Sequence, residues 1–268
     1  MNKKDSIFIA LKIRKLVLKM ITESKSSHIG SSFSVIDILA VLYSDVLRIS
    51  PATYRSVERD YFILSKGHGV AAMYATLAAY GFISEEELTT YCQNDSRLFG
   101  HVTANGVPGV ELSTGSLGHG LPVASGIAKA FKLDKKSNRV FVLLSDGECD
   151  EGTTWESALF CAHHQLDNVN MIVDYNKLQG LGTVEEIMRL EPFSDKWKAF
   201  GWNVVEIDGH DHADIKTQLN KKNISNKPTI IIAHTVKGRG VGFMENKLQW
   251  HYASPNAEQF NLAQKELG

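Results

Sequence analysis

The sequence predicts a doubly wound α/β fold, in which a mostly parallel sheet carries helices on both faces. Five short apolar runs alternate with segments of helical periodicity, as in a sheet wound through crossover helices. The runs at 140–144 and 230–232 are apolar at every position, which suits strands covered on both faces. No internal repeat or proline-rich linker divides the chain, so we expect one domain over residues 1–268.

The elements follow in chain order. Residues 6–23 place apolar side chains at helical spacing and lysines between them, which predicts an amphipathic surface helix. The Ser- and Gly-rich residues 24–34 predict a loop, and Ser34 is expected to cap a second helix that reaches Val46. A further helix is expected at 153–165. The expected strands are residues 61–64, 139–144, 169–174, 202–207 and 228–233.

Composition excludes several classes of function. The 29 basic and 30 acidic residues nearly balance, so no overall field favours nucleic acid or an anionic membrane. Three cysteines without a C-x-x-C pair indicate neither a disulfide framework nor a zinc ribbon. The N-terminus Met1–Asp5 lacks the pattern of an export signal, and no apolar run is expected to approach membrane-spanning length. We therefore expect a soluble cytoplasmic protein.

Polar residues follow the second and third expected strands, where open parallel sheets bind ligands. Asp146 and Gly147 end one strand, and Asn176 lies 30 residues after Asp146 and ends the next. One intervening helix returns the chain, so the two strand ends should lie side by side. Each residue alone is a common turn former, but together they offer oxygen ligands for Mg²⁺ with a diphosphate. Gly147 lets the backbone approach a phosphate closely.

This spacing resembles the thiamine diphosphate signature, in which G-D-G is followed about thirty residues later by Asn. Further motifs in the same order resemble the N-terminal subunit of a transketolase that is split into two chains. These motifs lie at 27–30, 65–68, 100–101, 108–118, 146–152, 155–156, 174–179, 237–240, 243–246 and 250–251. Trp250, His28 and the 237–240 segment favour this family over two rivals with the same metal motif, deoxyxylulose phosphate synthase and the E1 α subunit of 2-oxo acid dehydrogenases.

The resemblance implies a role for each matching residue. Asp146, Asn176 and the main-chain carbonyl of Leu178 would bind the metal, which would be Mg²⁺, Ca²⁺ or Mn²⁺. The residues implied to contact thiamine diphosphate are His68, Gly115, Leu117, Asp146, Gly147, Glu151 and Asn176. Ser145 departs from the family pattern by replacing the first glycine of G-D-G. Segment 179–182 also differs, at the entrance to the site.

The ten histidines divide into two groups. His28, His68, His101 and His251 lie in motif-bearing loops, and the resemblance implies that they line the substrate channel as catalytic residues. Neutral imidazoles there would donate to ketose oxygens and relay protons near neutral pH. Structural roles are expected for His163, His164, His210 and His212, whereas His119 and His234 receive no role.

The implied activity is the reversible transfer of a two-carbon ketol unit from a ketose or ketose phosphate to an aldose or aldose phosphate. In the family a glutamate on a pyrimidine-binding domain activates the cofactor, and we expect that domain and the C-terminal domain to be absent from this chain. We therefore expect a partner subunit that carries them, in an α2β2 heterotetramer. Glu151 and Glu156 are expected at its interface, although a helix N-terminus alone also favours acids. A non-catalytic regulatory paralogue is the alternative, with Ser145 its one hint.

Overall fold

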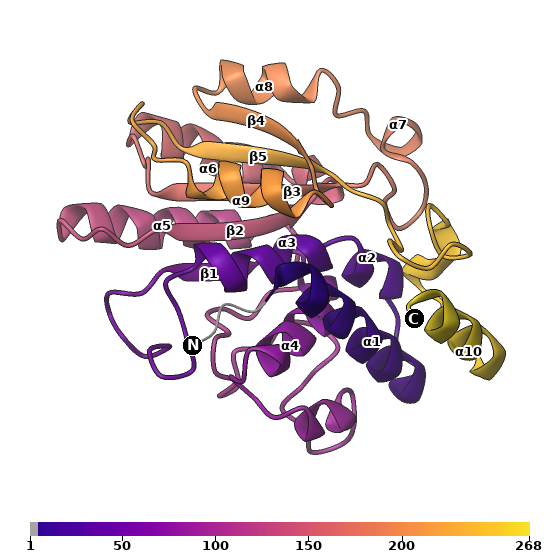
Figure 1. Ribbon diagram of the computed structural model, residues 1–268. Helices are drawn as coiled ribbons and strands as arrows, with labels where there is room; N and C mark the ends of the chain where they lie inside the picture. Colours follow the sequence, from indigo (N-terminus) through magenta and orange to yellow (C-terminus); the bar gives the residue numbers. More distant parts are fainter. Residues whose placement is uncertain (1–4) are drawn as a thin grey trace.

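Five parallel strands form the centre of the computed structural model, which describes residues 5–268 (Figure 1). Their order across the sheet is β1-β2-β3-β5-β4, and every neighbouring pair is parallel. The strands are β1 Tyr61–Leu64, β2 Val140–Ser145, β3 Val169–Tyr175, β4 Asn203–Asp208 and β5 Thr229–His234. All five expected strands are confirmed to within one residue. Residues 1–4, part of the N-terminus expected to carry no export signal, lie outside the described residues.

Side chains alternate between two apolar cores, one on each face of the sheet. In β2, Phe141 and Leu143 join the core under one set of helices, while Val140, Val142 and Leu144 join the core under the other. The first set is α1 Ser6–Ser24, α3 Ile36–Val41, α4 Val70–Ala79 and α9 His212–Asn220. The second set is α5 Gly120–Leu133, α6 Gly152–His163 and α8 Phe193–Ala199. The doubly wound α/β fold is confirmed.

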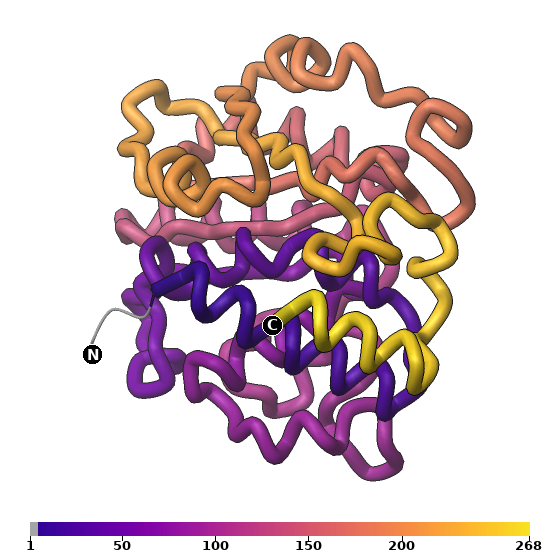
Figure 2. Tube along the Cα trace, turned by 45° about the vertical axis from the view of Figure 1, so that its right-hand side comes forward, coloured from indigo at the N-terminus to yellow at the C-terminus, as the bar shows by residue number. Residues whose placement is uncertain are grey.

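Shorter elements connect these layers. Helix α10, Ala257–Glu266, lies beside α1 and brings the C-terminus to the N-terminal helix (Figures 1 and 2). The remaining elements are α2 Ile29–Phe33, α7 Val184–Ile187, the π-helix η1 Leu42–Val46, and the 3₁₀ turns η2 Gly67–Gly69, η3 Glu86–Thr90, η4 Gly147–Asp150 and η5 Leu248–His251.

The structure corrects the predicted loop at 24–34. Helix α2 lies within it, and all five of its residues are buried. Burial against neighbouring elements outweighs the local preference of Ser and Gly for a loop. The hydroxyl of Ser34 also does not cap α3, because it donates to the Ser31 carbonyl and to Asp174. The N-cap residue of α3 is Val35, which provides no side-chain hydrogen bond.

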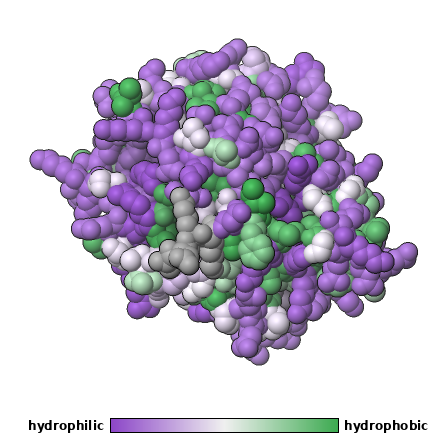
Figure 3. Space-filling model, viewed as in Figure 1, coloured by the Kyte–Doolittle hydropathy of each residue, from purple (hydrophilic) through white to green (hydrophobic). Residues whose placement is uncertain are grey.

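The expectation about apolar runs also needs a correction. Ile29–Val46 is one run of 18 residues that is long and apolar enough to cross a membrane, judged by length and composition alone. Within the fold 89% of this run is buried, because its apolar side chains pack in the core between α1 and the sheet. A buried core helix is weak evidence for a membrane span. The face shown in Figure 3 is mainly hydrophilic, with small apolar patches.

Candidate functional site

The ends of β2 and β3 lie side by side, because Ser145 pairs in register with Asp174. Asp146 and Asn176 therefore lie at neighbouring strand ends, as predicted. Both line a cavity of about 250 Å³. The lining residues are Ser31, Lys66, His68, Leu117, Ser145, Asp146, Gly147, Asn176, Leu178, Gln179, Gly180, Lys237, His251 and Tyr252.

Asp146 is a buried carboxylate without a cation. Its two oxygens accept backbone hydrogen bonds from Gly147 (2.8 Å) and Lys177 (2.7 Å). Among residues 5–268, no Lys, Arg or His forms an ion pair with it. Burial, and then the negative charge of Asp174, raise the pKa of Asp146 to about 6. A cation in the cavity would stabilise the ionised form and lower this pKa.

Asn176 and Leu178 present oxygen atoms beside Asp146. The Asn176 amide nitrogen donates to Asp174 (3.0 Å), and its oxygen accepts from the Leu178 N–H (3.1 Å). The Leu178 carbonyl accepts from Lys237 (2.7 Å). The described part of the chain holds no group of three His, Cys, Asp or Glu side chains that would bind a metal alone. The predicted donors therefore fit a metal only if a ligand supplies further oxygens.

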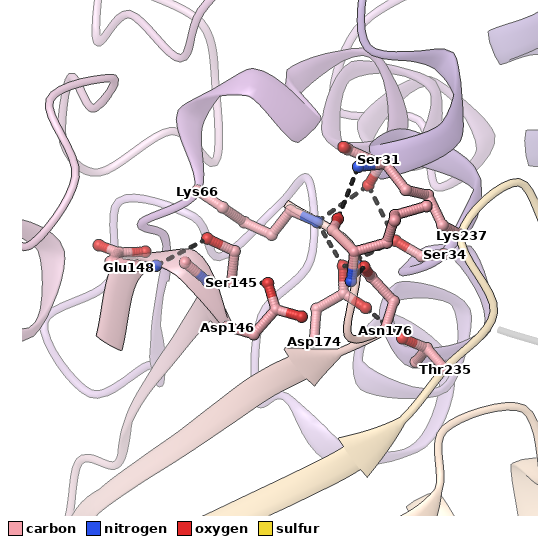
Figure 4. A network of polar contacts seen from close by, with 12 residues as sticks. Ser31, Ser34, Lys66, Ser145, Asp146, Glu148, Asp174, Asn176, Thr235 and Lys237 are labelled. Carbon is pink, nitrogen blue, oxygen red and sulfur yellow. Dashed lines mark hydrogen bonds and ion pairs between the residues drawn. The ribbon is translucent and has the colours of Figure 1, made fainter. Parts of the chain in front are cut away.

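A buried ion pair between Lys66 and Asp174 lies next to the predicted metal ligands (Figure 4). The Lys66 ammonium pairs with Asp174 and donates to the Ser31 carbonyl at 3.0 Å. Asp174 also accepts from the hydroxyls of Ser34 and Thr235. Burial opposes ionisation of Asp174, but the charge of Lys66 and these donors hold its pKa below the usual value. Through its bond to Asn176, Asp174 fixes the direction of that amide.

Lys237 is a buried ammonium that forms no ion pair with a carboxylate of residues 5–268. Its Nζ atom donates to the carbonyls of Leu178 and Gln179 and to Nδ1 of His251 (2.9 Å), all of which are neutral acceptors. The residue is 1% exposed and lines the cavity. Burial, and then repulsion from Lys66, lower its pKa to about 8. An anionic ligand would compensate this charge.

Ser145, the departure from the family motif, adopts an ordinary backbone conformation. It is not among the residues with positive φ, so the loss of glycine causes no strain here. Its hydroxyl accepts a hydrogen bond from the Glu148 N–H at 3.2 Å. The serine therefore stabilises the turn that follows β2, which orients Asp146.

The structure brings the four predicted channel histidines together. The ring centroid of His28 lies 5.3 Å from His68, 5.7 Å from His101 and 5.0 Å from His251. His28 adopts φ 74°, which is rare for a non-glycine residue, and its N–H donates to the His251 carbonyl at 2.9 Å. This backbone bond joins the loop before α2 to η5.

The histidine cluster favours neutral imidazoles. Burial is the main cause, and it lowers the pKa of His28 to about 4, that of His251 to about 3, and that of His68 well below 6.5. Neighbouring Lys66 and Lys237 contribute repulsion in the same direction. Because Lys237 only donates, Nδ1 of His251 accepts and its proton lies on Nε2.

The remaining predicted site residues lie around the cavity and do not line it. His28 and His101 join it through ring contacts, and the Gly115 backbone packs on the His101 ring. Glu151 precedes α6 and is exposed, as is Glu156. Neither carboxylate has a hydrogen bond or ion pair within residues 5–268, so both remain available to another molecule.

The other histidines serve the fold or the surface. His210 and His212 both contact the buried carboxylate of Asp37, which confirms a structural role. Helix α9, which begins at His212, is capped by Asp211. His234 contacts Glu206 at the exposed end of β5. The His119 ring contacts the Leu117 carbonyl, and His163 and His164 end α6.

Sequence reasoning missed Lys66 and Lys237 as site residues. Both lie just beyond a buried strand and directly before a glycine, at the ligand-binding edge of a parallel sheet. That position is the signal that would have found them. Only the packed structure shows that both lysines are buried.

Comparisons with known proteins agree with this geometry. The family model described as the thiamine diphosphate binding domain of transketolase matches residues 6–268. One subunit of the apulose-4-phosphate transketolase from Phocaeicola vulgatus is 43% identical over 96% of this chain and 91% of its own length. A 6-deoxy-6-sulfo-D-fructose transketolase subunit, SqwG, of a Clostridium species is 40% identical over 95% of this chain and 93% of its own.

Solved structures show the same fold. The transketolase from Campylobacter jejuni superposes with a TM-score of 0.88 at 31% identity and is matched over 97% of this chain. The Leishmania mexicana transketolase gives 0.90 at 26% identity over 100% of this chain. The chain spans 42% of the length of each of these two transketolases.

Proposed function

The chain belongs to the transketolase family as an N-terminal subunit, and on that premise we propose that its cavity binds the diphosphate and metal of thiamine diphosphate. The unpaired charges carry this proposal. Within residues 5–268 neither the buried Asp146 carboxylate nor the buried Lys237 ammonium forms an ion pair, and both line the same cavity. A diphosphate bound with a divalent cation would satisfy both charges at once.

For the metal we propose Mg²⁺, with Ca²⁺ or Mn²⁺ as substitutes. Asp146, the Asn176 amide oxygen and the Leu178 carbonyl are the proposed protein donors, and diphosphate oxygens complete the shell. Gly147 lines the cavity at the turn after β2, where a Cβ atom would lie 3.3 Å from the Gln179 side chain, and its bare backbone is the proposed phosphate contact. His68 and Leu117 line the same cavity, and Gly115 lies beyond it as the proposed pyrimidine contact.

When bound, thiamine diphosphate supplies the electron sink for breaking the carbon–carbon bond next to a ketose carbonyl. The chain's own contribution is position and proton transfer. His28, His68, His101 and His251 surround the proposed path of the sugar, and their neutral rings donate to carbonyl and hydroxyl oxygens. The Nε2–H of His251 is the donor that Lys237 fixes in place.

We propose that the active enzyme also contains a C-terminal subunit with the pyrimidine-binding domain, in an α2β2 assembly. Two relatives that this chain matches over more than nine tenths of their length are themselves named as single subunits of transketolases. Glu151 and Glu156 are proposed to face that partner. The cytoplasm is the proposed location, and all three cysteines are free thiols.

The proposed substrates are ketose donors and aldose acceptors with an anionic group at the far end. The names of the relatives support this class, since one acts on a ketose phosphate and the other on a sulfonated ketose. The groups that bind the anionic end are expected mostly on the partner subunit.

Two measurements on the reconstituted pair test this proposal. Calorimetry with thiamine diphosphate should show binding that requires Mg²⁺ and is lost with a chelator. Product analysis should show an aldose released from a ketose phosphate and no turnover of pyruvate. Binding without turnover would support a regulatory paralogue, and turnover of pyruvate would support a dehydrogenase-type subunit.

A further inference from the structure

Gly180 lies where the cavity opens, and its backbone conformation does not require glycine. Its φ is outside the left-handed region that side chains avoid. A Cβ atom at this position would lie 2.9 Å from the Tyr252 hydroxyl and 3.3 Å from Nε2 of His251. Space therefore explains the glycine, because the phenol of Tyr252 occupies the volume that a side chain at 180 would fill.

Tyr252 is an exposed aromatic residue that nevertheless lines the cavity. It is 59% exposed, and its ring lies 4.7 Å from the ring of His251 and 6.3 Å from that of His28. Its hydroxyl has no hydrogen-bond partner within residues 5–268, although its backbone N–H bonds to Gln249. The phenol thus adds little to the core, and it places an unused donor and acceptor beside two channel histidines.

We propose that Tyr252 is a specificity-determining residue, whose ring forms the cavity wall left open by Gly180 and whose hydroxyl binds a hydroxyl of the incoming sugar. This inference rests on the proposed function and adds a contact on this chain to it. A polyhydroxylated carbon chain suits such a wall, because aromatic rings cover C–H faces while a phenol exchanges hydrogen bonds with hydroxyls. The neutral imidazoles of His28 and His251 would bind neighbouring oxygens of the same chain.

The first test removes the hydroxyl from the reconstituted two-chain enzyme. Tyr252→Phe should raise KM for ketose phosphate donors about fivefold, as expected for one lost neutral hydrogen bond, and leave kcat within about twofold. The affinity for thiamine diphosphate, measured by calorimetry, should not change. Tyr252→Ala should raise KM further and reduce discrimination between a four-carbon ketose and longer ketose phosphates. Tyr54→Phe, in a loop after η1, is the matched control.

The second test measures the coupling between positions 180 and 252. Gly180→Ala should push the phenol aside, raise KM as Tyr252→Ala does, and lower the thermal unfolding midpoint of the full chain. In a Tyr252→Ala background the same substitution should have a much smaller effect on both quantities, because only the 3.3 Å contact with Nε2 of His251 remains. Gly126→Ala on α5 is the control, because its Cβ would meet nothing within 4 Å.

Three outcomes would overturn the inference. One is an active wild-type pair in which neither Tyr252 variant changes KM. Another is a loss of cofactor affinity equal to the rise in KM, which would make Tyr252 a cofactor contact. The third is an additive effect of Gly180→Ala and Tyr252→Ala. A wild-type pair that binds thiamine diphosphate but transfers no ketol unit would instead contradict the proposed function itself.

Discussion

At the scale of single residues, the site combines buried charges that the fold compensates only in part. Asp146 and Lys237 form no ion pair within residues 5–268, and the attraction that Lys237 feels from Asp146 and Asp174 does not offset its loss of solvation, which is unfavourable for folding. Lys66 and Asp174, one layer below, do pair and position Asn176. We therefore assign Asp146 and Lys237 to ligand binding, and Lys66 and Asp174 to the support of the ligand-binding groups.

Replacing Asp146 should therefore separate binding from stability. Asp146→Ala in the reconstituted pair is expected to abolish Mg²⁺-dependent binding of thiamine diphosphate, with affinity reduced at least a hundredfold. The unfolding midpoint of the free chain should change little, because the removal of a buried carboxylate offsets the loss of its two backbone hydrogen bonds. Calorimetry and thermal unfolding check both expectations. Asp195→Ala, an exposed site on α8, is the control, and unchanged affinity in Asp146→Ala would rule out the assigned metal site.

The neutral state of His251 predicts a pH dependence of stability. Its pKa is about 3 in the fold and ordinarily 6.5, so the unfolded chain binds more protons between these values. Stability should thus fall as pH decreases from 6.5 toward 4. His251→Gln removes this contribution, so its unfolding midpoint should fall less than that of the wild type between pH 7 and pH 5. If the unfolding midpoints of the wild type and of His251→Gln fall equally between pH 7 and pH 5, the ring is not held neutral.

At the scale of elements, Asp37 ties three helices together. It lies on α3 and contacts Arg14 of α1, His210 before α9, and His212 at the start of α9. Although burial opposes ionisation, the two histidines and Arg14 hold the pKa of Asp37 well below its usual range. Its stabilising effect is therefore present at neutral pH and is lost as pH falls below the ordinary carboxyl value.

Asp37→Asn should lower the free energy of unfolding by about 3 kcal/mol at neutral pH, because Arg14 keeps a buried charge without its partner. Urea unfolding measures this change. Asp134→Asn, an exposed carboxylate after α5, should change the free energy by less than about 0.5 kcal/mol. Equal effects of the two substitutions would show that the tie between the helices is unimportant.

Helix α6 offers a test of the proposed interface. Replacement of both Glu151 and Glu156 by Gln should weaken the association with the C-terminal subunit about tenfold. It should leave the unfolding midpoint of the free chain unchanged. Analytical ultracentrifugation of the mixed subunits measures the pairing. Glu258→Gln in the first turn of α10 is the matched control. If all variants pair equally well, the acids only complement the helix N-terminus.

Sequence predicted the strands better than the segments that complete the site. Apolar residues on both faces reveal β2 and β5 directly, and Asp146 and Asn176 follow from their places beyond β2 and β3. Helix α2 is hidden by its Ser and Gly content and forms because its residues are buried. The relation between Gly180 and Tyr252 spans 72 positions and exists only in the folded chain.

At the scale of the whole molecule, the two-sided sheet brings the proposed metal ligands to one edge. The strand ends supply Asp146 and Asn176, and segments distant in sequence add His28 and His251. Two relatives that this chain matches over more than nine tenths of their length are named as single subunits of transketolases. We therefore expect this chain to bind the diphosphate and line the channel, and a partner subunit to complete the active site.

Ketol transfer by the purified chain, by its C-terminal partner and by the mixture of the two tests this division of labour most directly. A ketose phosphate donor, an aldose acceptor, thiamine diphosphate and Mg²⁺ are present in each assay. We predict activity only in the mixture, rising to saturation at equal amounts of the two subunits. Full activity from this chain alone would contradict the proposed two-chain enzyme.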